Sequence, residues 1–235
     1  MTPPHGVAPS AVLRTKLAQV EPALRAASVR MWRRPGLDRR YPEYLRVMHG
    51  VVRASVPLME LAERRCADLG PADPVAAPFR RYLRRHAAEE RGHDDWILDD
   101  LAALGADPAV PLTAPPPPAV ARLVGPQYYW TVHHHPVALL GYIAVLEGNA
   151  PATALAGWIV SRTGLPDAGL RTVREHAALD AGHTDAVFDL LDALPLTAGQ
   201  IAIVTTSALS TVDALVTLYG YLSGRAGIAE TGGWT

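Results

Sequence analysis

The segment REHAALDAGH, residues 174–183, places three side chains of metal-ligand type at a helical spacing. His176, Asp180 and His183 follow one another at intervals of four and three residues. On an α-helix of about 3.6 residues per turn these positions form one stripe, so two imidazoles and a carboxylate would point the same way. A solvated helix face with two surface histidines would give the same pattern. The segment therefore indicates a metal site only if other segments supply further ligands.

The segment HAAEERGH, residues 86–93, contains a second group of such side chains: His86, Glu89, Glu90 and His93. Glu90 and His93 form a Glu-x-x-His pair, which in carboxylate-bridged di-iron bundles gives a bridging oxygen and a terminal nitrogen to one metal centre. A charge pair on a solvated helix is the alternative. Five arginines between residues 80 and 91 would form the exposed side of the same helix. Glu90 and His93 could then face the interior.

Glu147 is the only charged residue between Pro136 and Val160. A carboxylate without a partner in an apolar core costs several kcal/mol or stays protonated. A bound metal cation would remove that cost. The alternative is a glutamate that faces solvent at an edge of the fold, where Gly148 and Asn149 follow it.

The side chains in these segments restrict the kind of metal. Cys66 is the only cysteine, so the ligands must be nitrogen and oxygen. Three imidazoles and three carboxylates are typical of a two-iron or iron–manganese site, whereas a structural zinc closes with four ligands. The carboxylates would neutralise most of the charge of a diferrous pair and leave positions open for dioxygen and a substrate. The six candidate ligands are Glu90, His93, Glu147, His176, Asp180 and His183.

The composition describes one globular domain. The chain has 235 residues, is 49% hydrophobic and 19% charged, and has a formal net charge of −1, so it can bury a core and lacks the basic excess of nucleic-acid-binding proteins. A single cysteine suits the reducing cytoplasm. The N-terminal residues lack the pattern of a signal peptide, and Glu147 and Pro151 interrupt the apolar run around them. We therefore expect a cytoplasmic protein with no membrane span.

Apolar residues recur at helical spacing along most of the chain, with almost no strand signal. The run IAIVTTSALS is β-branched, but an isolated strand would have nothing to pair with. A proline-rich connection covers residues 106–118. We predict an all-α fold, a single helical bundle of about seven helices in one domain over residues 1–235, with a loosely ordered tail at about 224–235. The predicted helices include residues 10–32, 41–69, 76–104, 137–161, 167–193 and 197–222.

Four stretches together resemble the haem-oxygenase-like di-iron oxidases and oxygenases, iron-containing redox enzymes within the broader TenA and PqqC-like helical group. They are MHGVVRASVPLMELA, HAAEERGHDDW, YYWTVHHHPVALLGYIAVLEG and REHAALDAGH. The resemblance covers residues 40–195, and its most specific part is the His-x3-Asp-x2-His run with the upstream Glu-x-x-His pair and the glutamate between them. It implies a haem-oxygenase-like bundle and iron ligation by the six side chains named above. It also implies two iron ions per chain, one of them labile, and no haem.

The resemblance leaves some ligand positions open. Some relatives use a carboxylate one or two turns before the histidine, where this chain has His86 and Glu89. Others take a ligand from the preceding helix. His49 and Glu60 are the candidates there, because eleven residues separate them and they share one helix face.

Three further residues are candidates for contact with a substrate. Arg53 lies among apolar residues and could bind a carboxylate through two hydrogen bonds, or extend to solvent. Tyr129 could line a cavity, although aromatic residues before a helix more often pack in the core. His134 belongs to a run of three histidines for which capping and pocket lining are favoured over metal ligation.

The sequence thus predicts a non-haem di-iron oxidase or oxygenase that uses dioxygen to oxidise an amino-acid-like, amine or fatty-acid substrate in specialised biosynthesis. By resemblance we expect a homodimer, and an external electron donor is a possible further partner. Two other classes stay open. One is a PqqC-like oxidase that works without a metal, and the other is a non-enzymatic helical binding protein whose glutamate and histidines form a buried polar network.

Overall fold

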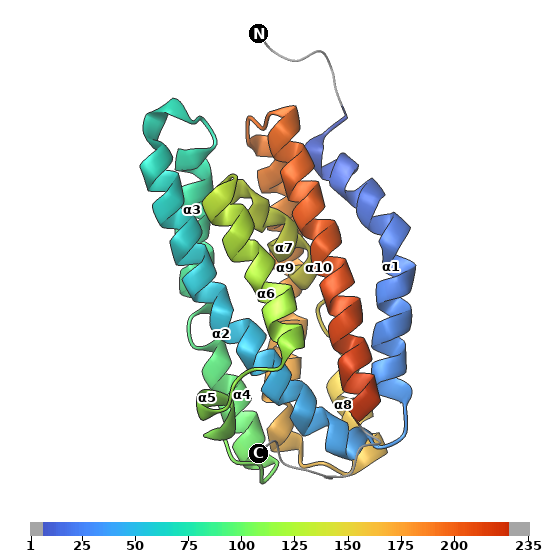
Figure 1. Ribbon diagram of the computed structural model, residues 1–235. Helices are drawn as coiled ribbons and strands as arrows, with labels where there is room; N and C mark the ends of the chain where they lie inside the picture. The colour runs from blue at the N-terminus through green and yellow to red at the C-terminus, as the bar shows by residue number, and fades with distance from the viewer. Residues whose placement is uncertain (1–6, 226–235) are drawn as a thin grey trace.

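The computed structural model describes residues 7–225, except for the side chains at positions 180–183 and 225. All regular secondary structure in this range is helical, and the longer helices run side by side in an elongated bundle (Figure 1). The predicted all-α fold is therefore confirmed. Most of the loosely ordered tail predicted at about 224–235 lies outside the described residues, and helix α10 continues to Arg225.

Seven of the α-helices in the described range have 11 residues or more, which agrees with the number predicted. Short 3-10 helices precede α3, α7 and α9, at Gly70–Ala72, Pro136–Ala138 and Asp167–Leu170. The α-helices are α1 (Pro9–Arg33), α2 (Leu37–Leu69), α3 (Ala76–Glu90), α4 (His93–Ala103), α5 (Val110–Thr113), α6 (Pro118–His133), α7 (Leu139–Glu147), α8 (Leu155–Thr163), α9 (Arg171–Ala193) and α10 (Ala198–Arg225).

Two of the predicted helices are each divided in two. The helix predicted at 76–104 is broken between α3 and α4, where Gly92 has a φ of +89°, a backbone conformation that glycine adopts at little cost. The helix predicted at 137–161 ends at Glu147 and resumes at Leu155 as α8. Each break has a glycine at or beside it, Gly92 and Gly148, and the prediction wrongly joined the apolar segments on either side into one helix.

Helix α6 was not predicted, and the run of three histidines begins inside it. Pro126 lies inside α6, and a proline usually ends a helix because it lacks an N–H donor. His133 is the last residue of α6, so only His134 and His135 follow it outside the helix. The proline-rich connection also contains one short helix, α5.

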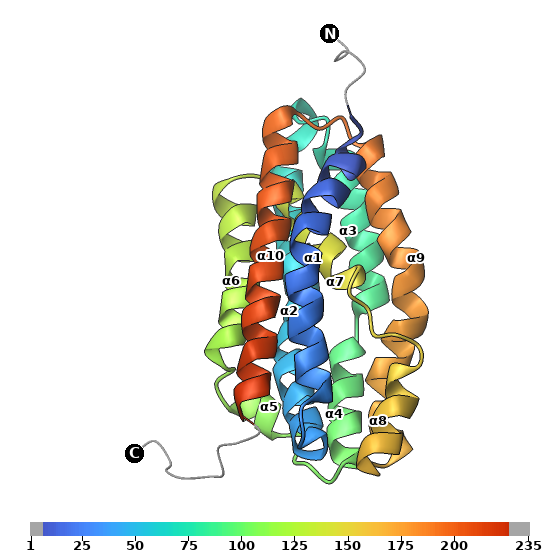
Figure 2. The same ribbon diagram turned by 90° about the vertical axis from the view of Figure 1, so that its right-hand side faces the viewer.

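Helix α7 lies in the interior of the bundle. Every residue from Leu139 to Val145 is buried, and α7 packs against α6, α9 and α10. Both views show it enclosed by the longer helices, with α1 lying along α10 on one side (Figure 2). The only charged side chain of α7 therefore lies inside the protein.

Helix α10 is long and apolar enough over Ala198–Gly224 to cross a membrane, judged by length and composition. In the bundle it packs against α1, α6 and α7. Val204, Val212 and Leu215 are among its buried side chains. Its apolar composition thus corresponds to a core position, and no other helix in the described part of the chain meets the same criteria.

The backbones of α7 and α10 meet at Gly141. A Cβ atom at this position would lie 2.1 Å from the carbonyl oxygen of Val204 and 2.7 Å from the backbone nitrogen of Ala208. Neither backbone atom can rotate away as a side chain could. The glycine is therefore required for the spacing of these two helices.

Replacing Gly141 with alanine should destabilise the protein by about 1–3 kcal/mol, because the added methyl group forces the two helices apart. Chemical denaturation measures the free energy of unfolding. Gly157→Ala is the matched control, since Gly157 is also helical and a Cβ there meets nothing within 4 Å; it should be neutral or slightly stabilising. Equal effects of the two substitutions would contradict the close packing at Gly141.

An ion-pair cluster joins α2 to α3 on the outside of the bundle. Oε1 of Glu63 accepts hydrogen bonds from Nε of Arg80 at 2.7 Å and from Nε of Arg84 at 2.8 Å. The hydrogen bond from Arg80 is the main reason that the pKa of Glu63 is lowered, against an opposing effect of burial. The ionised carboxylate is thus favoured in the folded protein.

Glu63→Gln should lower the free energy of unfolding by about 1 kcal/mol at neutral pH. Because the folded-state pKa is below the unfolded value, this contribution is present above the unfolded pKa and is lost as the pH falls through the folded one. Denaturation curves of both proteins at neutral and acidic pH measure the difference. Glu60→Gln serves as the control, because Glu60 is 43% exposed and contacts one arginine. A difference that persists in acid would rule out the electrostatic explanation.

Candidate metal centre

Three of the predicted ligands lie at helix ends. Glu90 is the last residue of α3, His93 is the first residue of α4, and Glu147 is the last residue of α7. The turn at Gly92 brings Nδ1 of His93 to 3.3 Å from Oε2 of Glu90. The predicted pairing of Glu90 with His93 is thus achieved across a helix break and not along one helix.

The side chains form two groups that share one carboxylate. Glu90, His93 and His176 each offer a ligand atom, and these atoms lie within 4.8 Å of one another. The same holds for His86, Glu90 and Glu147, with Nε2 of His86 at 3.3 Å from Oε1 of Glu147. Four helices, α3, α4, α7 and α9, converge on Glu90 in this way.

The donor atoms are taken out of solvent. The side chains of His86 and His93 are 4% and 6% exposed, and those of Glu90 and Glu147 are each 10% exposed. Burial alone would raise the pKa of Glu90, but the imidazoles of His93, His86 and His176 lower it. Burial opposes protonation of His86, but the neighbouring glutamates, Glu147 foremost, outweigh it and raise its pKa. The centre therefore favours the ionised form of Glu90 and attracts positive charge.

Contacts from α4 and α9 orient the two imidazoles beside Glu90. Nδ1 of His176 lies 2.9 Å from the carbonyl oxygen of Thr172, which can only accept, so in the neutral imidazole Nδ1 carries the proton and Nε2 has the free lone pair. The indole of Trp96 stacks on the ring of His93 at 4.0 Å between centroids and meets the ring of His176 edge-on at 6.0 Å.

Asp100 determines where α9 begins. Its side chain is fully buried, and its two oxygens accept hydrogen bonds from the backbone nitrogens of Arg171 at 3.0 Å and Thr172 at 2.9 Å. The carboxylate thereby satisfies two donors at the start of the helix. Since His176 lies in the second turn of α9, Asp100 ties its position to α4.

The other predicted ligand positions have different surroundings. The side chains of Asp180 and His183 lie outside the described residues, so their ligand role stays a prediction. Glu89 is 43% exposed, with an oxygen 3.6 Å from Nδ1 of His86. Glu60 forms an ion pair with an arginine at the surface. His49 is buried, but neither donor group includes it.

A cavity of about 520 Å³ adjoins the donor groups. Its described lining includes His86, Glu90, Glu147 and His176, together with many apolar side chains. Of the charged lining residues, Arg25 on α1 was not identified from the sequence. Nothing in the local sequence marks it, because it approaches the cavity only through the packing of α1 on the bundle.

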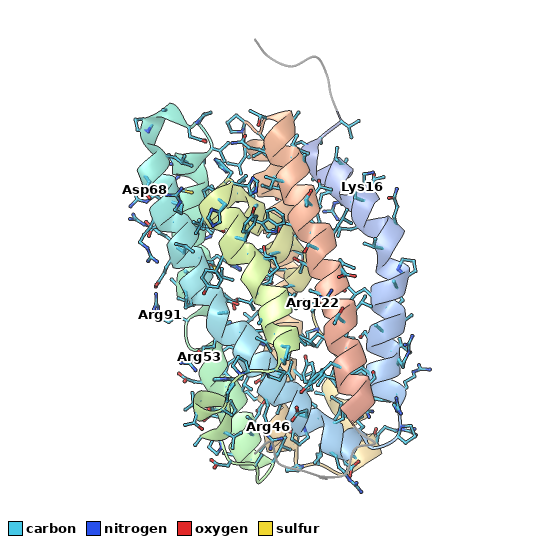
Figure 3. All side chains as sticks on the ribbon, viewed as in Figure 1. Lys16, Arg46, Arg53, Asp68, Arg91 and Arg122 are labelled. Atoms are coloured by element: carbon cyan, nitrogen blue, oxygen red, sulfur yellow. The ribbon has the colours of Figure 1, made fainter. Side chains whose placement is uncertain are left out.

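The three predicted substrate contacts lie elsewhere. Arg53, Tyr129 and His134 are exposed and do not line this cavity, and Arg53 extends from the outer side of α2 (Figure 3). Arg53 falls on the solvent side of an amphipathic helix, and the other two residues lie at the outer end of α6. The cavity therefore gives no support to their predicted role.

The fold and the centre together define a helical protein with buried nitrogen and oxygen donors at the wall of a cavity. The sequence matches the model of a family described as iron-containing redox enzyme over residues 43–215. This protein belongs to that family. The predicted resemblance is confirmed, and an oxidoreductase that contains iron is the corresponding general function. A comparison with curated proteins gives no match.

Two solved structures show the same fold. A domain of unknown function with a haem-oxygenase-like fold, from Shewanella denitrificans OS217, has a TM-score of 0.73 at 18% identity, covering 92% of this chain and 96% of that chain. A TenA homologue from Pseudomonas syringae pv. tomato strain DC3000 has a TM-score of 0.64 at 12% identity, covering 88% and 92%. The predicted haem-oxygenase-like bundle is thus confirmed.

Asp100→Ala should destabilise the protein by about 2–3 kcal/mol, because two buried N–H groups lose their acceptor. It should also weaken binding of Co²⁺ or Fe²⁺, since the start of α9 positions His176. Denaturation and metal titration measure the two effects. Asp99→Ala is the control, because that side chain is 70% exposed and, within the described residues, pairs with the exposed side chain of Arg171. Unchanged stability in Asp100→Ala would contradict this role.

Proposed function

We propose that this protein is a non-haem di-iron oxidase or oxygenase that activates dioxygen to oxidise a small-molecule substrate. The observation that carries the proposal is the pair of donor groups that share Glu90 at the wall of a largely apolar cavity. A carboxylate common to two groups can bridge two metal ions, as in carboxylate-bridged di-iron bundles.

The chemistry of the donor set fits iron. Imidazole nitrogen and carboxylate oxygen suit ferrous and ferric ions, and the only thiol, Cys66, is buried outside both groups, where burial raises its pKa to about 12. The buried Nδ1 of His93 and Oε2 of Glu90 lie 3.3 Å apart, so one metal ion could be held by both atoms. Asp180 and His183 remain proposed ligands in addition to the five described side chains.

Bound ferrous ions would supply the electrons and the open coordination positions that dioxygen activation needs. The residues of this chain would orient the ligands and exclude water. Thr172 fixes the tautomer of His176, and Trp96 restricts the ring of His93. The apolar wall of the cavity keeps bulk water from the reacting atoms. The hydroxyl of Tyr142, a lining residue, is buried without a hydrogen-bond partner in the described structure and can contact a bound substrate.

The remaining partners belong to the same proposal. We propose dioxygen and a small-molecule substrate as reactants, an external electron donor where turnover requires one, and a cytoplasmic homodimer as the working form. Nucleic acid and membrane are not proposed as partners, because the net charge of −1 provides no basic surplus and α10 is packed inside the bundle.

Anaerobic titration of the purified protein with ferrous iron should show about two ions bound per chain, followed by a transient visible absorption on exposure to air. Glu90→Ala should weaken binding at both positions because both groups use this carboxylate, whereas His86→Ala should affect one. Iron content and helicity are measured together, so that loss of metal is separated from unfolding.

Glu60→Ala is the control and should bind iron as the unaltered protein does, since Glu60 is a surface glutamate outside both groups. A protein that binds no iron and shows no absorption would exclude the proposal. A Soret band with one iron per chain would identify haem instead. Retention of both ions in Glu90→Ala would eliminate the shared carboxylate.

A further inference from the structure

The cavity beside the donor groups is buried from solvent in its deep part and exposed to solvent at its rim. The side chains of His86, His93, Glu90 and Glu147 are 10% exposed or less, whereas the side chain of Arg25 is 72% exposed. The metal-binding groups thus lie at the buried part, and Arg25 lies where the cavity opens to solvent. Ser28 and Trp32 from the same helix, the loop at residues 149–152 and Leu155 of α8 also line the cavity.

The walls between these two parts are mainly apolar. Six of the buried lining side chains are Leu45, Val51, Leu58, Met59, Ile143 and Leu215. A volume of about 520 Å³ is within the range of sites that enclose most of a small ligand. Such walls stabilise a bound hydrocarbon chain through the burial of its surface, and offer nothing to a compact polar molecule.

The charges of the lining are unequally placed. Among the described lining residues Arg25 is the only guanidinium or ammonium group, and the carboxylates are Glu90 and Glu147, both in the donor groups. Outside the metal centre, the carboxylate next to Arg25 is Glu21, which is not a lining residue and is already paired with that arginine. An ammonium group at the rim would therefore face the positive charge of Arg25 before it could reach Glu21.

We propose that the substrate is an elongated amphiphile with a single anionic head group, and that it binds with this head group at Arg25 and its apolar chain directed toward the donor groups. This inference rests on the proposed function and specifies its substrate. A carbon atom of the chain, distant from the head group, is then the part presented for oxidation.

The orientation follows from the cost of burying charge. An anionic head group at the rim keeps much of its hydration and gains a guanidinium partner, whereas at the apolar walls it would lose its hydration without a partner. Arg25 is now paired with Glu21 one helical turn earlier. An exposed pair of this kind contributes little to stability, so a ligand can replace Glu21 at small cost.

Isothermal titration of the metal-free protein with n-alkanoates of about six to twelve carbons tests the substrate class. Affinity should rise about fourfold per methylene until the cavity is filled, because each added group is buried. Matched n-alkylamines should bind more weakly than the alkanoates of equal length. Equal or tighter binding of the amines, or affinity independent of chain length, would overturn the proposal.

Arg25→Gln tests the position of the head group. It should weaken binding of an alkanoate by roughly fivefold and leave the matched n-alkanol unchanged. Arg30→Gln is the control, since Arg30 is an exposed arginine of the same helix that does not line the cavity; it should change neither. If Arg25→Gln has no effect on alkanoates, Arg25 does not hold the head group. Ala152→Trp, at an exposed lining position, should weaken binding of alkanoates and alkanols alike.

The visible spectrum of the Co²⁺-loaded protein tests the direction of the chain. Saturating alkanoate should leave the ligand-field bands in place, because the head group stays away from the metal. A shift that reports a carboxylate on cobalt would overturn the orientation. The titrations need no metal, so alkanoate binding without iron-dependent activity would reject the proposed function alone, and iron binding without alkanoate binding would reject this inference alone.

Discussion

The structure depends on two buried carboxylates held close together. Glu90 and Glu147 are each 10% exposed and belong to one donor group with His86, and two like charges in an apolar interior are unfavourable unless positive charge or hydrogen-bond donors compensate them. Imidazoles on three helices surround them and lower the pKa of Glu90. The two neighbouring carboxylates are unfavourable when no metal is bound, and for the same reason they attract a cation.

The surrounding structure holds this centre from several directions. Glu90 and His93 depend on the turn at Gly92, and Glu147 depends on the end of α7. His176 depends on α9, whose start is bound to the fully buried carboxylate of Asp100 on α4. The result is a polar centre whose parts come from segments far apart in the chain, in keeping with functional sites that rest on a rigid second layer of contacts.

Much of the fold and part of the centre could be predicted from residue types and spacing. Apolar periodicity identified the long helices, and Glu147 was recognisable as the one charge in an apolar run. The breaks at Gly92 and after Glu147 were missed although Gly92, Gly148 and Pro151 mark them, because glycine and proline also occur inside helices and do not by themselves locate an end. Helix α6 was missed because Pro126 suggests an interruption.

The cavity itself was beyond sequence reasoning. Its rim depends on α1 lying near the loop before α8, a segment more than one hundred residues later in the chain. The local sequence therefore does not mark Arg25 as a substrate contact. It does mark Arg53, an arginine among apolar residues, but Arg53 faces solvent in the structure. Residue types and their spacing identify the side chains that can bind a metal. Only tertiary packing decides which side chains line the cavity beside the metal centre.

The contact at Gly141 has a consequence for how this protein can change during evolution. Because the backbones of α7 and α10 touch there, a larger residue at position 141 would force the two helices apart. The shape of the cavity on that side can then vary only through the lining side chains of these helices, such as Ile143 and Leu215, and not through the spacing of the helices. Relatives with new specificities should therefore differ in lining side chains, while position 141 stays glycine.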